Sequence, residues 1–353
     1  MIDQRYLEAF IRQYDLDLKG LTIYTEAASG HYLYAPILAA LAGAKVYAQA
    51  KDTRYSSAVN VINELSNTIQ KFGLENKIEV FEGRSKVRLR LSHIITNSAN
   101  VRPFDHDLID SLNSTAVIPL MWETWEYRPA DFDLNYCKKK GIVVLGTNER
   151  MHPCDMEYFI GLTALKLLME SGFDGGKILM LGNAPLPGLS VVTYFKKIGI
   201  SLTWFSEDPH ADYNYAELKD YWQRKGSDYN LIFLVDHHFK NVVIGSKGLL
   251  SFEEIIRVNK SVKLSIMCGN IDINGLYKSG LDYYPSEIAP FGFVTYQPFM
   301  LGPRPVLSLF AAGLKVGEAM ARARCLGYSI DEVVNEALKS SPAMDFEGKL
   351  SWL

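Results

Sequence analysis

The sequence predicts an α/β protein with two domains, each built around a mainly parallel sheet. The chain has 353 residues, whereas a single hydrophobic core stops growing at roughly 250 to 300 residues. Short runs rich in β-branched and aromatic residues alternate with segments of helical period along the whole chain, as in proteins whose strands are joined by crossover helices. One long apolar helical segment separates two such series.

The first series predicts a domain over residues 1–150. Its six strand candidates are 21–27, 44–50, 77–83, 92–99, 115–121 and 141–147. Helical patterns at 35–43 and around 57–73 lie between the early strands. Because helices and strands alternate, the six strands are expected to form one parallel sheet.

The segment PCDMEYFIGLTALKLLMES (153–171) predicts a single long helix, which Gly172 ends. Its apolar residues cover most of the helix surface instead of one stripe. A helix of that kind is usually buried on several sides, so we expect it to lie between the two domains.

The second series predicts a domain over residues 151–300. Its strand candidates are KILMLG (177–182), ISLTWFSED (200–208), YNLIFLVDH (229–237), VKLSIMCG (262–269) and FGFVTYQ (291–297), with helices between them at 189–199, 216–226 and 252–259. Two helical patterns in residues 301–353 have no strand to pair with in sequence order. We expect these C-terminal helices to return to the first domain.

Composition excludes several classes of function. The chain carries 37 basic and 40 acidic residues, with no long run of either sign, so it lacks the basic footprint of proteins that bind nucleic acid or an anionic membrane. Its four cysteines form no C-x-x-C pair, which argues against a zinc site or a disulfide framework and fits a reducing cytoplasm. No signal segment and no run of 18 apolar residues is present. We therefore expect a soluble cytoplasmic protein with a small-molecule ligand.

The stretch LGNAPLPGL (181–189) joins a predicted strand to a predicted helix, where a dinucleotide-binding turn would lie. Gly182 suits the tight turn, Ala184 lets the backbone approach a pyrophosphate, and Gly188 allows close helix packing. The sequence departs from the motif G-x-G-x-x-G, because Pro187 stands where the third glycine is expected and Gly188 follows one residue later. A plain strand–helix connection is the alternative.

An acid stands at the expected distance after this turn. Glu207 lies 25 residues after Gly182, close to the offset of the carboxylate that binds a ribose and favours NAD over NADP. The predicted NAD-binding residues are Gly182, Asn183, Ala184, Leu186, Pro187, Gly188, Glu207, Asp236 and Cys268.

Three stretches resemble a known family, the D-isomer-specific 2-hydroxyacid dehydrogenases of the formate and glycerate dehydrogenase type. SHIITNSANVRPFDHDLIDSL (92–112) resembles their strand, loop and helix near the substrate. DFDLNYCKKKGIVVLGTNE (131–149) resembles the segment that leads into their long interdomain helix, and GGKILMLGNAPLPG (175–188) would be their cofactor turn. The resemblance implies two Rossmann-like domains with NAD in the cleft.

The chain departs from that family at the catalytic positions. The family's arginine follows the strand that here reads VKLSIMCG, yet the next residues are Gly269, Asn270, Ile271 and Asp272. Its general-acid histidine falls near FGFVTYQPFMLGP (291–303), which contains no histidine. The chain therefore either performs a different chemistry in the same cleft or performs no hydride transfer.

Other polar residues are then candidates for catalysis. Asp236 and His237 close a predicted strand, where open α/β sheets bind ligands, and an imidazole can exchange a proton near neutral pH. Asn270 and Asp272 lie at the comparable place one strand along, although both residue types also cap helices. Glu126, between two tryptophans, could act as a buried acid or base, or the tryptophans could simply mark a core or an interface.

Two loops of the first domain could bind a substrate. Asn97 and Arg102 lie in TNSANVRP (96–103), where an arginine or a backbone amide could hold a carboxylate, although a surface salt bridge explains Arg102 equally well. Ser29 and His31 lie in EAASGHY (26–32), and Ser29 is equally suited to cap the next helix.

These observations lead us to expect an NAD-dependent oxidoreductase, a homodimer, that acts on a small polar or anionic substrate. One alternative is a protein that binds NAD or another nucleotide without redox turnover, which the missing arginine and histidine would explain. Another is a transferase of the S-adenosylmethionine type, because EAASGHY (26–32) follows a strand with an acid and a small loop.

Overall fold

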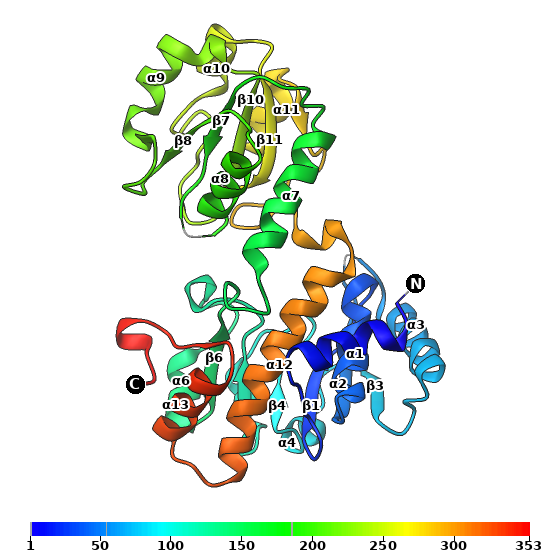
Figure 1. Ribbon diagram of the computed structural model, residues 1–353. Helices are drawn as coiled ribbons and strands as arrows, with labels where there is room; N and C mark the ends of the chain where they lie inside the picture. Colours follow the sequence, from blue (N-terminus) through cyan, green and yellow to red (C-terminus); the bar gives the residue numbers. More distant parts are fainter. Residues whose placement is uncertain (1, 54, 185) are drawn as a thin grey trace. The chain divides into compact units, whose positions relative to one another are not determined.

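The computed structural model (Figure 1) describes residues 2–53, 55–184 and 186–353. Its contacts divide the chain into two compact units: unit 1 comprises Met1–Asp155 and Pro303–Leu353, and unit 2 comprises Met156–Gly302. Each unit is built on one mainly parallel sheet. The predicted fold class is thus confirmed.

Unit 1 contains a seven-stranded sheet in the order β13-β6-β5-β4-β1-β2-β3. Neighbouring strands are parallel except at the edge, where β13 runs antiparallel to β6. The strands are β1 (Thr22–Glu26), β2 (Lys45–Ala50), β3 (Ile78–Glu82), β4 (Ile94–Ile95), β5 (Val117–Pro119), β6 (Val143–Thr147) and β13 (Ala343–Met344). From β1, the strands β2 and β3 lie on one side of the sheet, and β4, β5, β6 and β13 lie on the other.

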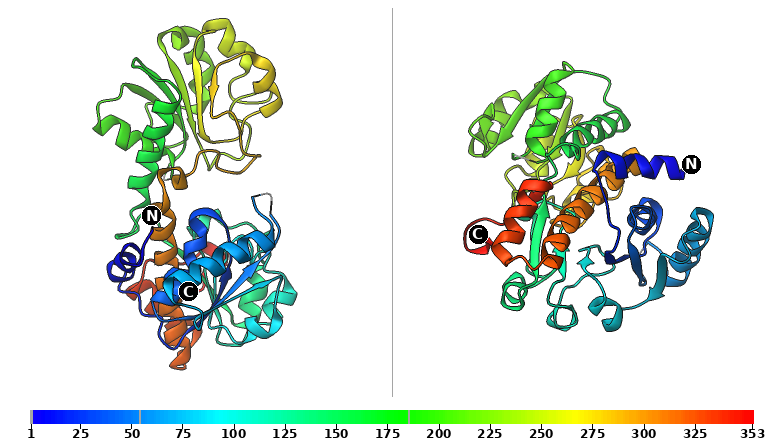
Figure 2. Two further views of the ribbon diagram at one scale, coloured as in Figure 1. Left: turned by 90° about the vertical axis from the view of Figure 1, so that its right-hand side faces the viewer. Right: turned by 60° about the horizontal axis from the view of Figure 1, so that its bottom comes forward.

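Helices cover both faces of this sheet. On one face α12 contacts β5, β6 and α2, and the right-hand view of Figure 2 shows α13, in red, beside α12, in orange. On the other face Leu89, Leu108 and Leu134 pack against Tyr24 and Ile95 of the sheet. The helices are α1 (Gln4–Gln13), α2 (Tyr34–Leu41), α3 (Ala58–Phe72), α4 (Lys86–Arg90), α5 (His106–Asp110), α6 (Leu134–Lys140), α12 (Pro303–Cys325) and α13 (Ile330–Ser340), with short 3₁₀ turns η1 (Gly30–Leu33), η2 (Thr124–Glu126) and η6 (Gly348–Leu350).

Unit 2 contains a six-stranded sheet in the order β12-β11-β10-β7-β8-β9, parallel throughout. The strands are β7 (Ile178–Leu181), β8 (Leu202–Ser206), β9 (Tyr213–Asn214), β10 (Leu231–Val235), β11 (Lys263–Cys268) and β12 (Tyr283–Tyr284). Every residue of β7 and β10 is buried, because helices cover both faces of a parallel sheet. Read from β9, the strand order is 3-2-1-4-5-6, which is the order of dinucleotide-binding domains.

The two faces of the unit 2 sheet pack against different helices. Trp222 of α9, Phe252 of α10 and Leu276 of α11 share one core with Ile232 and Leu234 of β10. On the opposite face α7 contacts α8 and β11. The helices are α7 (Met156–Glu170), α8 (Gly188–Lys197), α9 (Leu218–Lys225), α10 (Phe252–Val258) and α11 (Ile273–Ser279), with 3₁₀ turns η3 (Tyr215–Glu217), η4 (Gly226–Asp228) and η5 (Pro298–Leu301).

Two predicted strands differ in the structure. Residues 92–99 form only the two-residue strand β4, and just after it the hydroxyl of Thr96 bonds to the hydroxyls of Thr25 and Ser98. The strand predicted over 291–297 was wrong, since that segment is a loop with one isolated bridge, between Cys268 and Val294. The two-residue strands β9, β12 and β13 are too short to leave a pattern in the sequence.

Candidate functional site

Each sheet reverses its strand order at one point, and ligands of open α/β sheets bind outside the carboxyl ends of the strands at such a point. In unit 1 the reversal lies between β1 and β4, and in unit 2 between β7 and β10. Most of the predicted site residues follow directly after these strands or their neighbours. The structure therefore contains two candidate regions, one in each unit.

In unit 2 the turn from β7 to α8 has no room for side chains at its two glycines. A Cβ on Gly182 would lie 2.5 Å from the carbonyl oxygen of Val235, and a Cβ on Gly188 would lie 2.3 Å from the carbonyl oxygen of Asn183. Gly182 thus packs against the end of β10, while Gly188 packs the first residue of α8 onto the turn. These are the packing roles of the first and third glycines of a dinucleotide turn, performed here at a spacing one residue longer.

Asn183 connects this turn to the end of β8. Its side chain is buried, and Oδ1 accepts hydrogen bonds from Ser206 Oγ at 2.6 Å and from the backbone N–H of Glu207 at 2.7 Å. Its Nδ2 donates to the carboxylate of Glu207 at 3.3 Å. Asn183 therefore positions Glu207, whose side chain is exposed, beside the turn, where a ribose hydroxyl would lie in a dinucleotide site.

The other predicted cofactor residues of this turn differ in exposure. Leu186 and Pro187 are buried, and Ala184 is half-buried. Ser190, in the first turn of α8, is a residue that the sequence reasoning missed. Its Oγ is buried and has no hydrogen-bond partner in the part of the chain that the structure describes.

Asp236 and Asn270 are buried after β10 and β11, and both hold loops in place. The Asp236 carboxylate accepts hydrogen bonds from the hydroxyl of Tyr215 and from the backbone N–H groups of His238 and Phe239. The Asn270 side chain donates to the carbonyl of Phe239 and accepts from the N–H of Gly292. The polar atoms of Asp236 and Asn270 are therefore used in hydrogen bonds within the protein.

The remaining candidates of unit 2 lie in three different settings. His237 is half-buried, directly after β10. Cys268 is fully buried at the end of β11, and burial raises the pKa of its thiol well above the ordinary value. Asp272 caps α11, since its Oδ1 accepts from the N–H of Gly275 at 2.9 Å, as the capping interpretation predicts.

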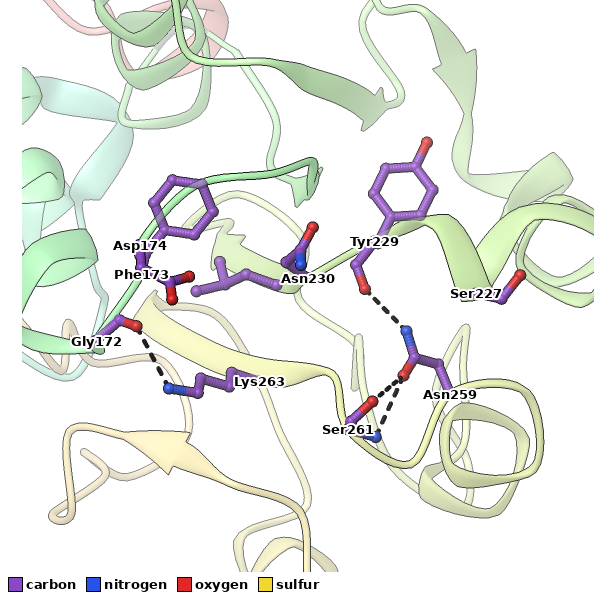
Figure 3. Close-up of a pocket in the computed structure, with 10 residues that line it drawn as sticks. Gly172, Phe173, Asp174, Ser227, Tyr229, Asn230, Asn259, Ser261 and Lys263 are labelled. Atoms are coloured by element: carbon purple, nitrogen blue, oxygen red, sulfur yellow. Dashed lines mark hydrogen bonds between the residues drawn. The ribbon is translucent and has the colours of Figure 1, made fainter.

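A pocket of about 340 Å³ opens at the opposite edge of the unit 2 sheet (Figure 3), beside the residues that precede or begin β7, β10 and β11. Its polar groups bond to one another. Asn259 donates to the carbonyl of Tyr229, and Lys263 Nζ donates to the carbonyl of Gly172. This pocket lies away from the glycine turn, at the edge where open α/β sheets do not bind their ligands.

Five buried N–H groups of unit 1 lack an acceptor within the described residues, and three of them follow β4 and β5: Asn97 Nδ2, Arg102 Nε and Trp122 Nε1. The other two, Arg324 Nε and Trp352 Nε1, belong to the C-terminal part of the unit. The first three lie close together, because the Arg102 guanidinium carbon is 4.8 Å from the centre of the Trp122 ring and Asn97 Oδ1 accepts from the N–H of Met121 at 2.9 Å. A buried donor without a partner costs about 1 to 3 kcal/mol, so these groups favour an ordered water or a ligand that carries acceptor oxygens.

The charge near these donors is mixed. Arg102 Nη1 pairs with Asp131 at 3.1 Å, and its backbone carbonyl accepts from Lys51 Nζ at 3.1 Å. The salt-bridge interpretation of Arg102 is thus correct for one nitrogen and leaves Nε without a partner. Burial lowers the pKa of Lys51, and the positive charge of Arg102 lowers it further. Lys51 is a second cation that the sequence reasoning missed.

The loop after β1 brings Ser29 and His31 to the same edge of the sheet. Ser29 occupies the cap position of η1 but forms no capping bond with its side chain, and both residues are half-buried. Glu26, at the end of β1, is almost completely buried and accepts from the N–H of Asn100 at 3.1 Å. Burial raises the pKa of Glu26, opposed by Asn100 and by the charge of Arg102.

A group of carboxyls follows β5 and β6. Glu123 is completely buried and accepts from Trp125 Nε1, from the N–H of Glu149 and from Arg150 Nε. Burial raises the pKa of Glu149 well above its ordinary value, and Glu126 and Glu123 raise it further. Glu126, the candidate named from the sequence, is half-buried in η2. Glu149 itself was missed, although it lies only two residues after the strand GIVVLGT (141–147).

Two other classes of site are not found in the described chain. None of the helices described is long and apolar enough to cross a membrane. In residues 2–53, 55–184 and 186–353, no group of three or more His, Cys, Asp or Glu side chains could hold a metal ion.

Comparison with known proteins shows similarity of fold. No protein-family model and no curated protein matches the sequence. One of the chains of dipicolinate synthase from Bacillus halodurans is similar in structure, with 12% sequence identity and a TM-score of 0.52 over 84% of this chain and 96% of that one. A dipicolinate synthase chain from Bacillus subtilis has 11% identity and a TM-score of 0.54 over 88% and 99%.

The structures similar to this chain also include 2-hydroxyacid dehydrogenases. The enzyme from Ketogulonicigenium vulgare has 10% identity and a TM-score of 0.46 over 88% of this chain and 96% of that one. At these identities the likeness is one of fold.

Proposed function

We propose that the protein is an NAD-dependent oxidoreductase that acts on a small anionic substrate. The observation that carries the proposal is the turn from β7 to α8, where neither Gly182 nor Gly188 has room for a Cβ. This turn stands at the reversal point of a sheet with the strand order of dinucleotide-binding domains.

The residues at this turn fit a dinucleotide. The backbone of Gly182 and Ala184 and the amino end of α8, which starts at Gly188, would hold the pyrophosphate. The unpartnered Oγ of Ser190 could donate to a phosphate oxygen, and Glu207 would accept from a ribose hydroxyl. When bound, NAD supplies the hydride chemistry, which no side chain can perform.

Unit 1 supplies the substrate anchor in this proposal. The unpartnered N–H groups of Asn97, Arg102 and Trp122 require acceptor oxygens, and Arg102 and Lys51 add positive charge. A carboxylate offers both, because its two oxygens accept charge-assisted hydrogen bonds from an arginine. Ser29 and His31, after β1, would complete the surroundings of such a ligand.

We keep a homodimer in the reducing cytoplasm as part of the proposal. The reducing compartment is supported by the cysteines, since those described are free and Cys137, Cys154 and Cys268 are buried. In a protein of this size none of them is needed as a disulfide.

NAD binding is tested by thermal unfolding. A ligand present at 100 times its dissociation constant stabilises the folded state by about 2.7 kcal/mol, so millimolar NAD or NADH should raise the melting temperature clearly. NADP should have a smaller effect, because Glu207 would repel a 2′-phosphate. If neither NAD nor NADH moves the transition, the proposal fails, and a shift with NADP alone would contradict the role of Glu207.

Arg102→Ala tests the anchor. Hydrogen bonds to charged groups contribute about 1.5 to 3 kcal/mol, so the variant should bind a small carboxylate ligand, such as a 2-oxo acid, about 10- to 100-fold more weakly, with NAD affinity unchanged. Isothermal titration with NAD measures the dissociation constant of NAD, and titration of the NAD-saturated protein with glyoxylate, pyruvate or hydroxypyruvate measures that of the carboxylate ligand.

Arg90→Ala is the matched control, since Arg90 is an exposed arginine of α4. It should bind as the parent does. Equal affinities of the Arg102 variant and the parent would remove Arg102 from the site.

A protein that binds NAD without turnover is the second candidate, favoured by the absence of a histidine in residues 291–303. Loss of NADH absorbance with the same 2-oxo acids distinguishes the two, because a binding protein would show the thermal shift without any oxidation of NADH.

A further inference from the structure

The sequence offers no histidine in the segment where the proposed function would need a proton donor, so a buried acid of unit 1 is the natural alternative for this role. The carboxyl edge of the sheet holds three buried carboxyl groups: Glu26 at the end of β1, Glu123 after β5 and Glu149 after β6. Their hydrogen bonds differ, and the difference separates their roles.

Glu123 is surrounded by donors. It accepts at 2.7 Å from Trp125 Nε1, at 3.2 Å from the N–H of Glu149 and at 3.3 Å from Arg150 Nε. These three donors, one of them a guanidinium, suit a carboxylate. Burial raises the pKa of Glu26, but the N–H of Asn100 and the charges of Arg102 and Lys51 oppose that rise.

Glu149 lacks such hydrogen-bond donors and such nearby cations. Its side chain is 9% exposed, no described residue donates to its carboxyl, and the charged groups that act on it are the acids Glu126 and Glu123. Burial without a donor and proximity to acids both favour the neutral form of a carboxyl. Two carboxyls whose surroundings differ in this way typically divide into one acid and one carboxylate.

Independent evidence for a ligand lies on the neighbouring strands. Asn97, which is completely buried after β4, keeps an unpartnered Nδ2 while its Oδ1 accepts from Met121 after β5. Trp122 Nε1 in the same turn has no partner among the described residues either. Parallel strands lie about 4.8 Å apart, so the ends of β4 and β6 are separated by about 10 Å, a span that a small ligand and a glutamate side chain together can bridge.

We propose that the carboxyl of Glu149 exchanges a proton with the ligand bound at this edge, a role that rests on the proposed function. An oxygen of the ligand takes the proton of Glu149, so that one O–H bond forms on the ligand as the O–H bond of Glu149 breaks. Glu149 is left as a carboxylate, which solvent then protonates again.

Infrared spectroscopy of the whole chain tests the proton directly. At neutral pH the parent should show the C=O band of protonated carboxyl groups, shifted in D₂O because the proton exchanges. Glu149→Gln should lose part of that band, and Glu64→Gln, which changes an exposed glutamate of α3, should lose none. Glu26→Gln identifies the part that belongs to the other buried carboxyl with a raised pKa.

A band that Glu149→Gln leaves at full intensity would overturn the proposal. A Glu149 band that stays unshifted in D₂O would overturn it as well, because the proton would then be trapped. The infrared result requires no NAD. Failure of NAD to stabilise the parent would therefore refute the proposed function alone, whereas NAD binding without a Glu149 band would refute this inference alone.

Stability gives a second readout with a definite sign. The folded pKa of Glu149 is raised, so as the pH rises the unfolded chain loses this proton first and the folded state becomes relatively less stable. Glu149→Gln removes that loss. Its melting temperature, relative to the parent, should be higher at pH of about 8 than at pH of about 5, and a difference that does not change with pH would contradict a protonated Glu149.

Discussion

Gly188→Ala is expected to destabilise unit 2 and to abolish NAD binding. The new Cβ would lie 2.3 Å from the carbonyl oxygen of Asn183 and 2.7 Å from the carbonyl carbon of Gly182. Both contacts are with backbone, so no side chain can turn away, and the turn and α8 must separate. Overpacking typically costs about 1 to 3 kcal/mol, and we expect a loss near the upper end, measured by urea unfolding.

Leu189→Ala is the control for this variant. Leu189 is the next residue of α8 and is 39% exposed, so the substitution leaves the turn as it is and should retain the thermal shift with NAD. If Gly188→Ala bound NAD as tightly as the parent, the β7–α8 turn would not be the cofactor site and the proposed function would lose its main support.

The buried strands were predictable because their sequence signal is local. The apolar run LIFLV of β10 lies between helices on both faces, and such strands read as continuous hydrophobic segments. The segment FGFVTYQ (291–297) has a similar composition but forms a loop, which meets the end of β11 through one isolated bridge between Cys268 and Val294. Composition alone therefore does not show whether a segment forms a continuous ladder with its neighbour.

The candidate site was predictable only where it depends on sequence spacing. The glycines of the β7–α8 turn lie six residues apart and were predicted from the sequence, because the strand, turn and helix are contiguous. The bonds of Asn183 to Ser206 and Glu207 join segments more than 20 residues apart, so the function of its side chain had no local signal. Asp236 illustrates the same limit: its position after β10 was predicted, but its three bonds were not.

Glu149 was missed for a related reason. Its chemistry depends on burial and on Glu123, which follows a different strand. The strand GIVVLGT and the rule that parallel strands end at one edge of the sheet would have identified the position. They could not have shown that Glu123 receives the donors and Glu149 receives none.

Asp236→Ala is expected to open the loop after β10. The Asp236 side chain is 1% exposed, and its removal leaves the Tyr215 hydroxyl and the N–H groups of His238 and Phe239 without their acceptor. An unsatisfied buried donor costs about 1 to 3 kcal/mol, so three of them should lower the free energy of unfolding by about 3 kcal/mol or more. Hydrogen exchange of the His238 and Phe239 amides should also become faster.

Tyr215→Phe removes a single bond of the same group and should cost about 1 kcal/mol, with the two amides still protected by the carboxylate. Asp228→Ala, at an exposed aspartate of η4, should change stability by less than about 0.5 kcal/mol. Because His237 lies between Asp236 and the two amides that Asp236 anchors, the Asp236 variant should also displace that histidine. Unchanged exchange at His238 and Phe239 in Asp236→Ala would show that the loop is held by other contacts, and Asp236 would then be available to a ligand.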